Sequence, residues 1–191
     1  ISKKVKLTPN EETVLDSVIY TTYSTGSTNI VWYENFESPS ISIEGDTIVG
    51  KQNNFVKTGR YSGLINFDYS DTVIAISSET FTISSEQGGY GLYLEFDYWT
   101  EDILYMGIQG KSRTSENNIN AFNILQVPTI KDNSTPDQPE KWRKIYVSLY
   151  ETWYSYFNPE YDFSVLFYAR KKEGSRYPGV YIDNIKLIHS K

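Results

Sequence analysis

The segment GLYLEFDYWT, residues 91–100, decides the fold class because apolar and polar side chains alternate along it. Successive side chains of a β-strand point to opposite faces of the sheet, so this alternation predicts a strand with one buried face. The set predicted to face the core is Leu92, Leu94, Phe96 and Tyr98. The set predicted to face outward is Tyr93, Glu95, Asp97 and Trp99.

Similar alternating stretches recur along the chain, with turn residues between them. They cover residues 61–67, 72–83, 103–109, 142–150, 163–170 and 179–188. Many short strands at this spacing predict an all-β fold built as a two-sheet antiparallel sandwich. The proline-containing stretch 128–140 is predicted to be a loop, and loops of this length often carry function.

Two of these strands can be assigned faces in the same way. In residues 142–150 the predicted core set is Ile145, Val147 and Leu149, and the outward set is Lys144, Tyr146, Ser148 and Tyr150. In residues 163–170 the predicted core set is Phe163, Val165, Phe167 and Ala169, and the outward set is Ser164, Leu166, Tyr168 and Arg170.

The composition fits one folded domain with an adhesive surface. The chain has 191 residues, of which 39% are hydrophobic, 22% charged and 16% aromatic, with 17 tyrosines. Such a chain can bury a core, and tyrosine favours both strands and recognition surfaces. The net charge of -6 argues against nucleic acid, because the phosphate backbone would repel the chain. The basic run at residues 170–172 is interpreted as a solvated hairpin tip.

The absence of cysteine and the single histidine, His189, exclude many kinds of active site. They remove cysteine nucleophiles, disulfides, thiolate zinc sites and histidine-cluster metal sites. His189 lies two residues from the chain end, where a surface role is expected. We therefore predict that the chain is not an enzyme.

The first 29 residues are predicted to form an extension that packs on a sandwich of residues 30–191. Thr8, Pro9 and Glu11 resemble a helix capping box with proline at the first helical position. The β-branched residues that follow suit a strand equally well, so one short helix and an extra strand both stay open for residues 9–19. No apolar run is long enough to span a membrane. Ile1 is not an initiator methionine, so we expect that a leader segment was removed. With it we expect export, a cell-surface location or lipid anchoring.

Two pairs of motifs resemble a known family pattern. YENFES at residues 33–38 precedes TGRYSG at residues 58–63, and WRKIYV at residues 142–147 precedes VYIDNIKL at residues 180–187. Their order resembles jelly-roll carbohydrate-binding modules, galactose-binding-like domains and MAM-type adhesion domains. The resemblance covers residues 30–190 and implies a jelly-roll sandwich. It also implies that the strands at residues 91–100, 142–150 and 163–170 share one sheet.

The closing strand is predicted to contain a bulge. Ile182 and Ile185 are three residues apart, so strict alternation cannot bury both unless a bulge near Asp183 and Asn184 intervenes. The resemblance implies a structural calcium ion at this place, with Glu37 and Asp183 as ligands. Two carboxylates fall short of the six to eight oxygens that calcium takes. The alternative is that Asp183 accepts backbone hydrogen bonds at the bulge.

The outward-facing aromatic and charged residues are the predicted ligand-binding surface. Flat aromatic rings stack on the apolar face of a sugar ring, and charged groups pair with its hydroxyls. The residues predicted for this surface are Tyr93, Glu95, Asp97, Trp99, Tyr146, Tyr150, Tyr168 and Arg170, with Lys144 among them. A neighbouring segment that covers the same face is the alternative. A second aromatic surface is predicted in the loop after residue 150, at Trp153, Tyr154 and Tyr156.

Glycoside hydrolysis requires a pair of carboxylates, and Glu95 and Asp97 lie on one face of a strand. Jelly-roll glucanases carry a Glu-x-Asp motif that ends in a second glutamate two or three residues further on. Trp99 and Thr100 occupy those two positions, so the acid/base residue is missing. The leading hypothesis is therefore a non-catalytic glycan-binding module of an exported or surface-anchored protein. A protein-interaction or adhesion domain that uses the same aromatic surface is the runner-up, and a hydrolase is the third.

Overall fold

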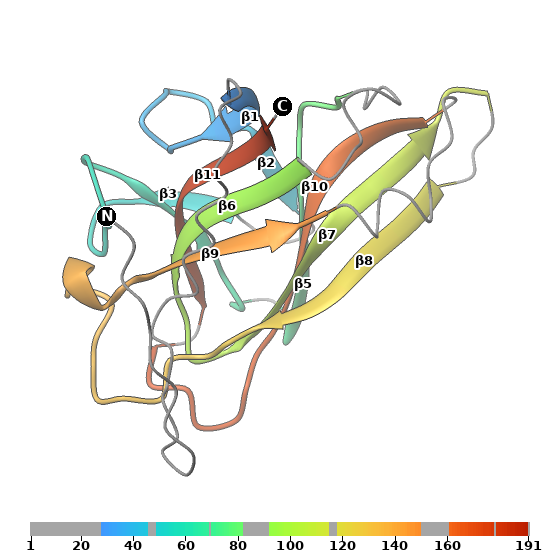
Figure 1. Cartoon of the computed structure of the whole chain (residues 1–191). Coiled ribbons are helices and arrows are strands. Elements are labelled where there is room, and N and C mark those ends of the chain that lie inside the picture. The colour runs from blue at the N-terminus through green and yellow to red at the C-terminus, as the bar shows by residue number, and fades with distance from the viewer. Residues whose placement is uncertain are drawn as a thin grey trace, which may run out of the picture.

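The computed structural model describes residues 28–45, 49–68, 70–81, 92–114, 118–149, 161–177 and 179–190. Two antiparallel sheets, one of six strands and one of five, face each other in a sandwich (Figure 1). The predicted two-sheet all-β fold is thus confirmed. No helix in the described part of the chain is long and apolar enough to span a membrane.

The first sheet, called sheet A below, has six strands in the order β3-β4-β11-β6-β9, and β1 pairs with β11 beside that path. Its strands are β1 (Thr28–Glu34), β3 (Val49–Gln52), β4 (Ser62–Ile65), β6 (Leu92–Trp99), β9 (Arg143–Ser148) and β11 (Val180–Ser190).

The second sheet, called sheet B, has five strands in the order β2-β5-β10-β7-β8. Its strands are β2 (Ile43–Gly45), β5 (Thr72–Ser77), β7 (Ile103–Ser112), β8 (Asn118–Val127) and β10 (Tyr161–Arg170). One short 3-10 helix, η1 (Pro139–Lys141), lies in the long loop between β8 and β9.

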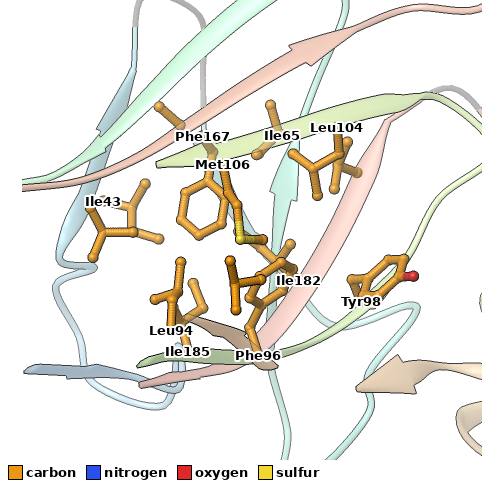
Figure 2. Close-up of a cluster of buried hydrophobic side chains, with 14 of the residues drawn as sticks. Ile43, Ile65, Leu94, Phe96, Tyr98, Leu104, Met106, Phe167, Ile182 and Ile185 are labelled. Carbon is orange, nitrogen blue, oxygen red and sulfur yellow. The ribbon is translucent and has the colours of Figure 1, made fainter. Parts of the chain in front are cut away.

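The core fills the space between the two sheets, and the predicted core sets of β6, β9 and β10 all point into it. Phe96 of β6 meets Phe167 of β10 edge to face, with 5.5 Å between the ring centroids. In Figure 2, Met106 of sheet B points toward Leu94 and Ile185 of sheet A. The alternation of side chains along each strand therefore predicts the inner and outer faces correctly.

The prediction that residues 163–170 share a sheet with residues 91–100 and 142–150 is wrong. β6 and β9 are neighbours in sheet A, whereas β10 lies between β5 and β7 in sheet B. Alternation reports which face of a strand is buried, but strands of both sheets bury one face against the same core. The sheet to which each strand belongs is set by long-range pairing, which the pattern within one strand does not contain.

The predicted bulge in the closing strand is confirmed. The register of β11 against β6 shifts between Asp183 and Lys186, and Asn184 has a positive φ of 50°. Ile182 and Ile185 are consequently both buried in the core. The extra residue turns Asp183 and Asn184 toward the outside of sheet A.

Two glycines explain why the motifs at residues 33–38 and 58–63 occur together. A Cβ on Gly63 would collide with the ring of Phe36, which is fully buried, and a Cβ on Gly59 would collide with Oε1 of Glu37. Gly59 also has a φ of 77°, a conformation that other residues adopt at a cost. Each glycine therefore makes room for one side chain of the first motif, so Phe36 and Glu37, just after β1, pack against residues 59–63.

Candidate functional site

The structure divides the predicted binding surface between the two outer faces of the sandwich. Tyr93, Glu95, Asp97 and Tyr146 lie on sheet A, and Tyr168 and Arg170 lie on sheet B. The predicted residues Tyr150, Trp153, Tyr154 and Tyr156 lie outside the described residues. Each outer face is therefore considered separately.

The outer face of sheet B carries two neighbouring tyrosines, Tyr105 of β7 and Tyr168 of β10. They are directly opposite each other in the register of the two strands, and their ring centroids are 5.8 Å apart with an angle of 52° between the ring planes. Both rings are half-buried. We call them the tyrosine pair. Because the rings are tilted, they present two aromatic surfaces that are twisted relative to each other.

Polar and aliphatic side chains surround the tyrosine pair. Ile74 of β5 is opposite Tyr168, and the exposed Gln126 of β8 is opposite Tyr105, so the four residues form one row across sheet B. Arg170, also exposed, lies two residues beyond Tyr168 on the same face. Aromatic rings with amide and guanidinium groups beside them offer flat apolar surfaces next to hydrogen-bond donors. Tyr105 was missed by the sequence reasoning, although it occupies an outward position in the alternating stretch 103–109.

The outer face of sheet A carries a second row of side chains across four strands. The register pairs Tyr33 of β1 with Lys186 of β11, Lys186 with Glu95 of β6, and Glu95 with Tyr146 of β9. We call these four residues the A row. Tyr33 and Lys186 were not predicted, because the residues around them gave no indication that β1 and β11 pair.

Charged side chains at the centre of the A row hold one another in place. Oε1 of Glu95 accepts hydrogen bonds from Nζ of Lys144 at 2.8 Å and from Nζ of Lys186 at 3.1 Å. The Lys144 ammonium also lies 3.4 Å from Oδ2 of Asp97. Burial by itself would raise the pKa of Glu95, but the hydrogen bonds and charges of the two lysines outweigh it and keep that pKa below its usual value. Glu95 is therefore ionised at neutral pH.

This arrangement does not provide the acid/base pair of a glycoside hydrolase. A general acid needs a carboxyl whose pKa is raised toward neutrality, and the lysines lower the pKa of Glu95 instead. Asp97 is buried, and its Oδ2 accepts a hydrogen bond from Nδ2 of Asn184 at 3.0 Å. Both carboxylates thus hold neighbouring side chains, which is a structural use.

Trp99 does not belong to an exposed surface, contrary to the prediction. It is fully buried in a second hydrophobic cluster on the outside of sheet A, together with Ile130, Trp142 and Tyr181. Its ring meets Tyr177 edge to face at 5.6 Å, and its Nε1 donates to Oγ of Ser134 at 3.4 Å. Alternation placed Trp99 on the outer face correctly but could not reveal that loops cover it there.

Two loops close over Trp99 and limit the open part of sheet A. Nζ of Lys57, in the loop between β3 and β4, donates to the carbonyl of Pro139 at 2.7 Å, in the loop between β8 and β9. Next to them, Asn184 donates from Nδ2 to Oγ1 of Thr58 at 2.8 Å. The loop between β10 and β11 is anchored to the same end by an ion pair of Arg176 with Glu101. These loops form a border beside the A row.

The residues predicted to bind calcium are already engaged by backbone groups. Oδ2 of Asp183 accepts from the N–H of Thr58 at 3.0 Å, and its Oδ1 accepts from the N–H of Asn184 at 2.8 Å. Oε1 of Glu37 accepts from the N–H groups of Arg60 and Tyr61. The alternative prediction, that Asp183 accepts backbone hydrogen bonds at the bulge, is thus confirmed.

Electrostatics at Asp183 nevertheless favour a positive charge. The pKa of Asp183 is raised to about 6, mainly by burial and further by the negative charges of Asp97 and Glu37, although the backbone N–H groups of Thr58 and Asn184 oppose the rise. Oδ1 of Asp97 is buried without a hydrogen-bond partner. The described residues, however, include no group of three or more side chains that converge as metal ligands. The donor set seen here does not by itself fit calcium, so the ion stays a prediction.

Comparison with solved structures identifies the type of sandwich. The C-terminal family 22 carbohydrate-binding module of Clostridium thermocellum Xyn10B matches 84% of this chain and 94% of its own length, with a TM-score of 0.55 and 12% identity. The CBM22-1 xylan-binding domain of Paenibacillus barcinonensis Xyn10C matches 87% and 97%, with a TM-score of 0.52 and 13% identity. The chain has the jelly-roll fold of carbohydrate-binding modules.

A third similar structure comes from another family of modules. The family 11 carbohydrate-binding module of the cellulosomal cellulase Lic26A-Cel5E of Clostridium thermocellum covers 87% of this chain and 97% of its own length, with a TM-score of 0.53 and 13% identity. No protein-family model and no curated protein matches the sequence. The similarity is therefore one of fold, and the function has to be argued from the site.

Proposed function

We propose that this chain is a non-catalytic glycan-binding module and that the tyrosine pair on sheet B is its principal binding surface. The observation that carries the proposal is the cross-strand pair of Tyr105 and Tyr168, whose rings are 5.8 Å apart on the outside of a jelly-roll sandwich. The structural similarity to carbohydrate-binding modules supports it.

The tilt between the two rings suits a chain of sugars. One sugar ring stacks its apolar C–H face on Tyr168, and the next stacks on Tyr105 after a rotation about the glycosidic bond. The exposed side chains of Gln126 and Arg170 supply hydrogen-bond donors for hydroxyl groups at the two sides. Aromatic rings bring a large contact area at a low entropic cost, which favours binding.

Affinity electrophoresis against a panel of soluble polysaccharides tests this proposal. The panel contains xylan, mixed-linkage glucan, mannan, arabinan and polygalacturonate. We expect at least one of them to retard the wild-type chain, and we expect Tyr168→Ala and Tyr105→Ala each to weaken the retardation by about tenfold. Lys171→Ala is the matched control, because it removes only an exposed ion pair with Asp71. Retardation that is equal in all folded variants contradicts the proposal.

Export to the cell surface or to the medium goes with this proposal, since glycans of this kind are met outside the cell. A protein-interaction or adhesion role is the outcome favoured if no polysaccharide binds and the chain forms a stable dimer instead.

Calcium is tested separately, by calorimetric titration of the metal-free chain. A titration that shows no binding heat and no shift of the melting temperature would rule out calcium. Calcium binding that the Asp183→Asn variant loses would support the ion.

A further inference from the structure

The large hydrophobic side chains that are exposed among the described residues all belong to sheet A. Four large ones are exposed there: Ile30, Val31 and Tyr33 of β1, and Tyr146 of β9. β1 and β9 flank β11 and β6, so they are the two outer strands of one half of sheet A. Clusters of exposed apolar side chains on a soluble domain usually mark a binding surface.

The A row connects these two strands and has aromatic ends and a polar centre. Tyr33 is 42% exposed and Tyr146 is 46% exposed, whereas Glu95 between them is buried. Neighbouring strands are about 4.8 Å apart, so the backbones that carry the two tyrosines are about 14 Å apart. A single sugar ring cannot bridge that distance, but a short oligosaccharide that lies across the strands can.

The polar centre is already ordered and carries no net charge. Lys144 and Lys186 are balanced by Glu95 and Asp97, and the Lys186 ammonium also lies 5.9 Å from the centre of the Tyr33 ring. Among the described residues, Glu95 is the only hydrogen-bond acceptor of the Lys186 ammonium, which has three donors. Donors are therefore available for hydroxyl groups, and fixing them costs little further entropy.

The order of polar and apolar groups argues for a sugar and against a protein partner. Protein interfaces have an apolar centre and a polar rim. The A row has the opposite order, with charged groups in the centre and tyrosines at the ends. The two ammonium groups are each paired with a buried carboxylate, so the centre of the A row carries no net charge and a neutral ligand needs to bring no counter-charge to it.

The loop border determines the direction of the ligand. The loops joined by Lys57 and Pro139 cover the end of sheet A around Trp99, on one side of the A row. A ligand that ran along the strands would meet these loops after a short distance. A ligand that runs across the strands, from Tyr33 to Tyr146, lies parallel to the border and is not obstructed by it.

From these observations we propose that the outer face of sheet A is a second, independent glycan-binding site, which takes a neutral oligosaccharide lying across β1, β11, β6 and β9. Tyr33 and Tyr146 stack on its sugar rings at the two ends. Glu95 and Lys186 bond to hydroxyl groups between them. This site shares no residue with the tyrosine pair, so it does not depend on that pair.

Calorimetric titration of the full chain tests the second site. The probes are xylohexaose and cellohexaose, which are neutral, and hexagalacturonate, which is anionic. We expect a neutral probe to bind the wild-type chain at two sites, and the double variant Tyr105→Ala/Tyr168→Ala at one. Adding Tyr146→Ala or Tyr33→Ala to that double variant should weaken the remaining site by about tenfold or more. Tyr61→Phe, outside both faces, is the control, and circular dichroism verifies the folding of each variant.

The outcomes separate the second site from the tyrosine pair. A single site in the wild type that Tyr168→Ala removes and Tyr146→Ala leaves intact overturns the second site and keeps the proposed function. A single site with the opposite response overturns the tyrosine pair and keeps the second site. Binding of hexagalacturonate alone overturns the neutral ligand. The second site is also overturned if no probe binds. It is overturned too if sedimentation shows a dimer of the wild-type chain that becomes a monomer in the Tyr146→Ala variant.

Discussion

Replacement of Trp99 by alanine is expected to destabilise the fold and to leave glycan binding intact. The tryptophan is fully buried between sheet A and the loops that cover it, and it packs against the rings of Tyr177 and Tyr181. The loss of a buried tryptophan creates a large cavity on the outside of β6. The two loops that the Lys57–Pro139 hydrogen bond joins would then lose their main apolar support.

The magnitude follows from the burial of the ring. Truncation of a buried aromatic side chain to alanine costs about 3–5 kcal/mol of unfolding free energy. The hydrogen bond from Nε1 to Ser134 adds little, since it is 3.4 Å long. For a domain of this size, 1 kcal/mol corresponds to about 2–4 °C, so the melting temperature should fall by roughly 6–20 °C. Tyr146→Ala removes an exposed ring and should change the free energy by less than about 0.5 kcal/mol.

Urea denaturation followed by far-ultraviolet circular dichroism measures both variants, with calorimetry for glycan affinity at a temperature where both are folded. We expect an earlier midpoint with an unchanged m-value for Trp99→Ala, because the native surface stays nearly the same. A loss of less than about 1 kcal/mol of unfolding free energy, together with a large loss of glycan affinity, would contradict a purely structural role for Trp99. That result would mean that Trp99 contacts the ligand.

Three further predictions concern the charged and strained positions. Asp102→Ala should lower the free energy of unfolding, measured by urea denaturation, by about 3–5 kcal/mol. The buried carboxylate accepts hydrogen bonds from Lys172, Ser175 and Gly179, and these donors would lose their acceptor. An unchanged midpoint would contradict this. Gly59→Ala should cost about 2 kcal/mol, since the residue has a positive φ and its Cβ would meet Glu37; stabilisation would contradict it. The pKa of Glu95 is lowered in the folded chain, so its contribution to stability is present above the unfolded pKa and is lost as the pH falls through the folded pKa. Glu95→Gln should therefore flatten the acid limb of the stability curve, and a parallel curve would exclude this effect.

The faces of the strands could be predicted from the sequence because each strand carries its own pattern. The inward sets of β6, β9 and β10 and the bulge at Asp183 followed from side-chain alternation alone. The resemblance also included the motif at residues 58–63, whose glycines the structure places against Phe36 and Glu37. Such features depend on neighbours in the chain or on a single close contact.

The arrangement of the site could not be predicted, because it depends on residues that are far apart in the sequence. Tyr33 joins the A row only because β1 pairs with β11, more than 150 positions away. Tyr168 leaves the predicted surface because β10 belongs to the other sheet. Trp99 is buried by the loop at residues 128–142, whose fold no local pattern describes. The strand β8 was missed as well, since its apolar and polar residues do not alternate strictly.

The central claim, that the tyrosine pair binds a glycan, is tested most directly by nuclear magnetic resonance. A soluble glycan that retards the chain in electrophoresis is titrated into the isotope-labelled chain, and the shifts of the backbone amides and tyrosine rings are followed. We expect the largest changes at Tyr105, at Tyr168 and on the facing residues of β5 and β8. Saturable changes that leave both tyrosines and the outer face of sheet B unaffected would contradict it.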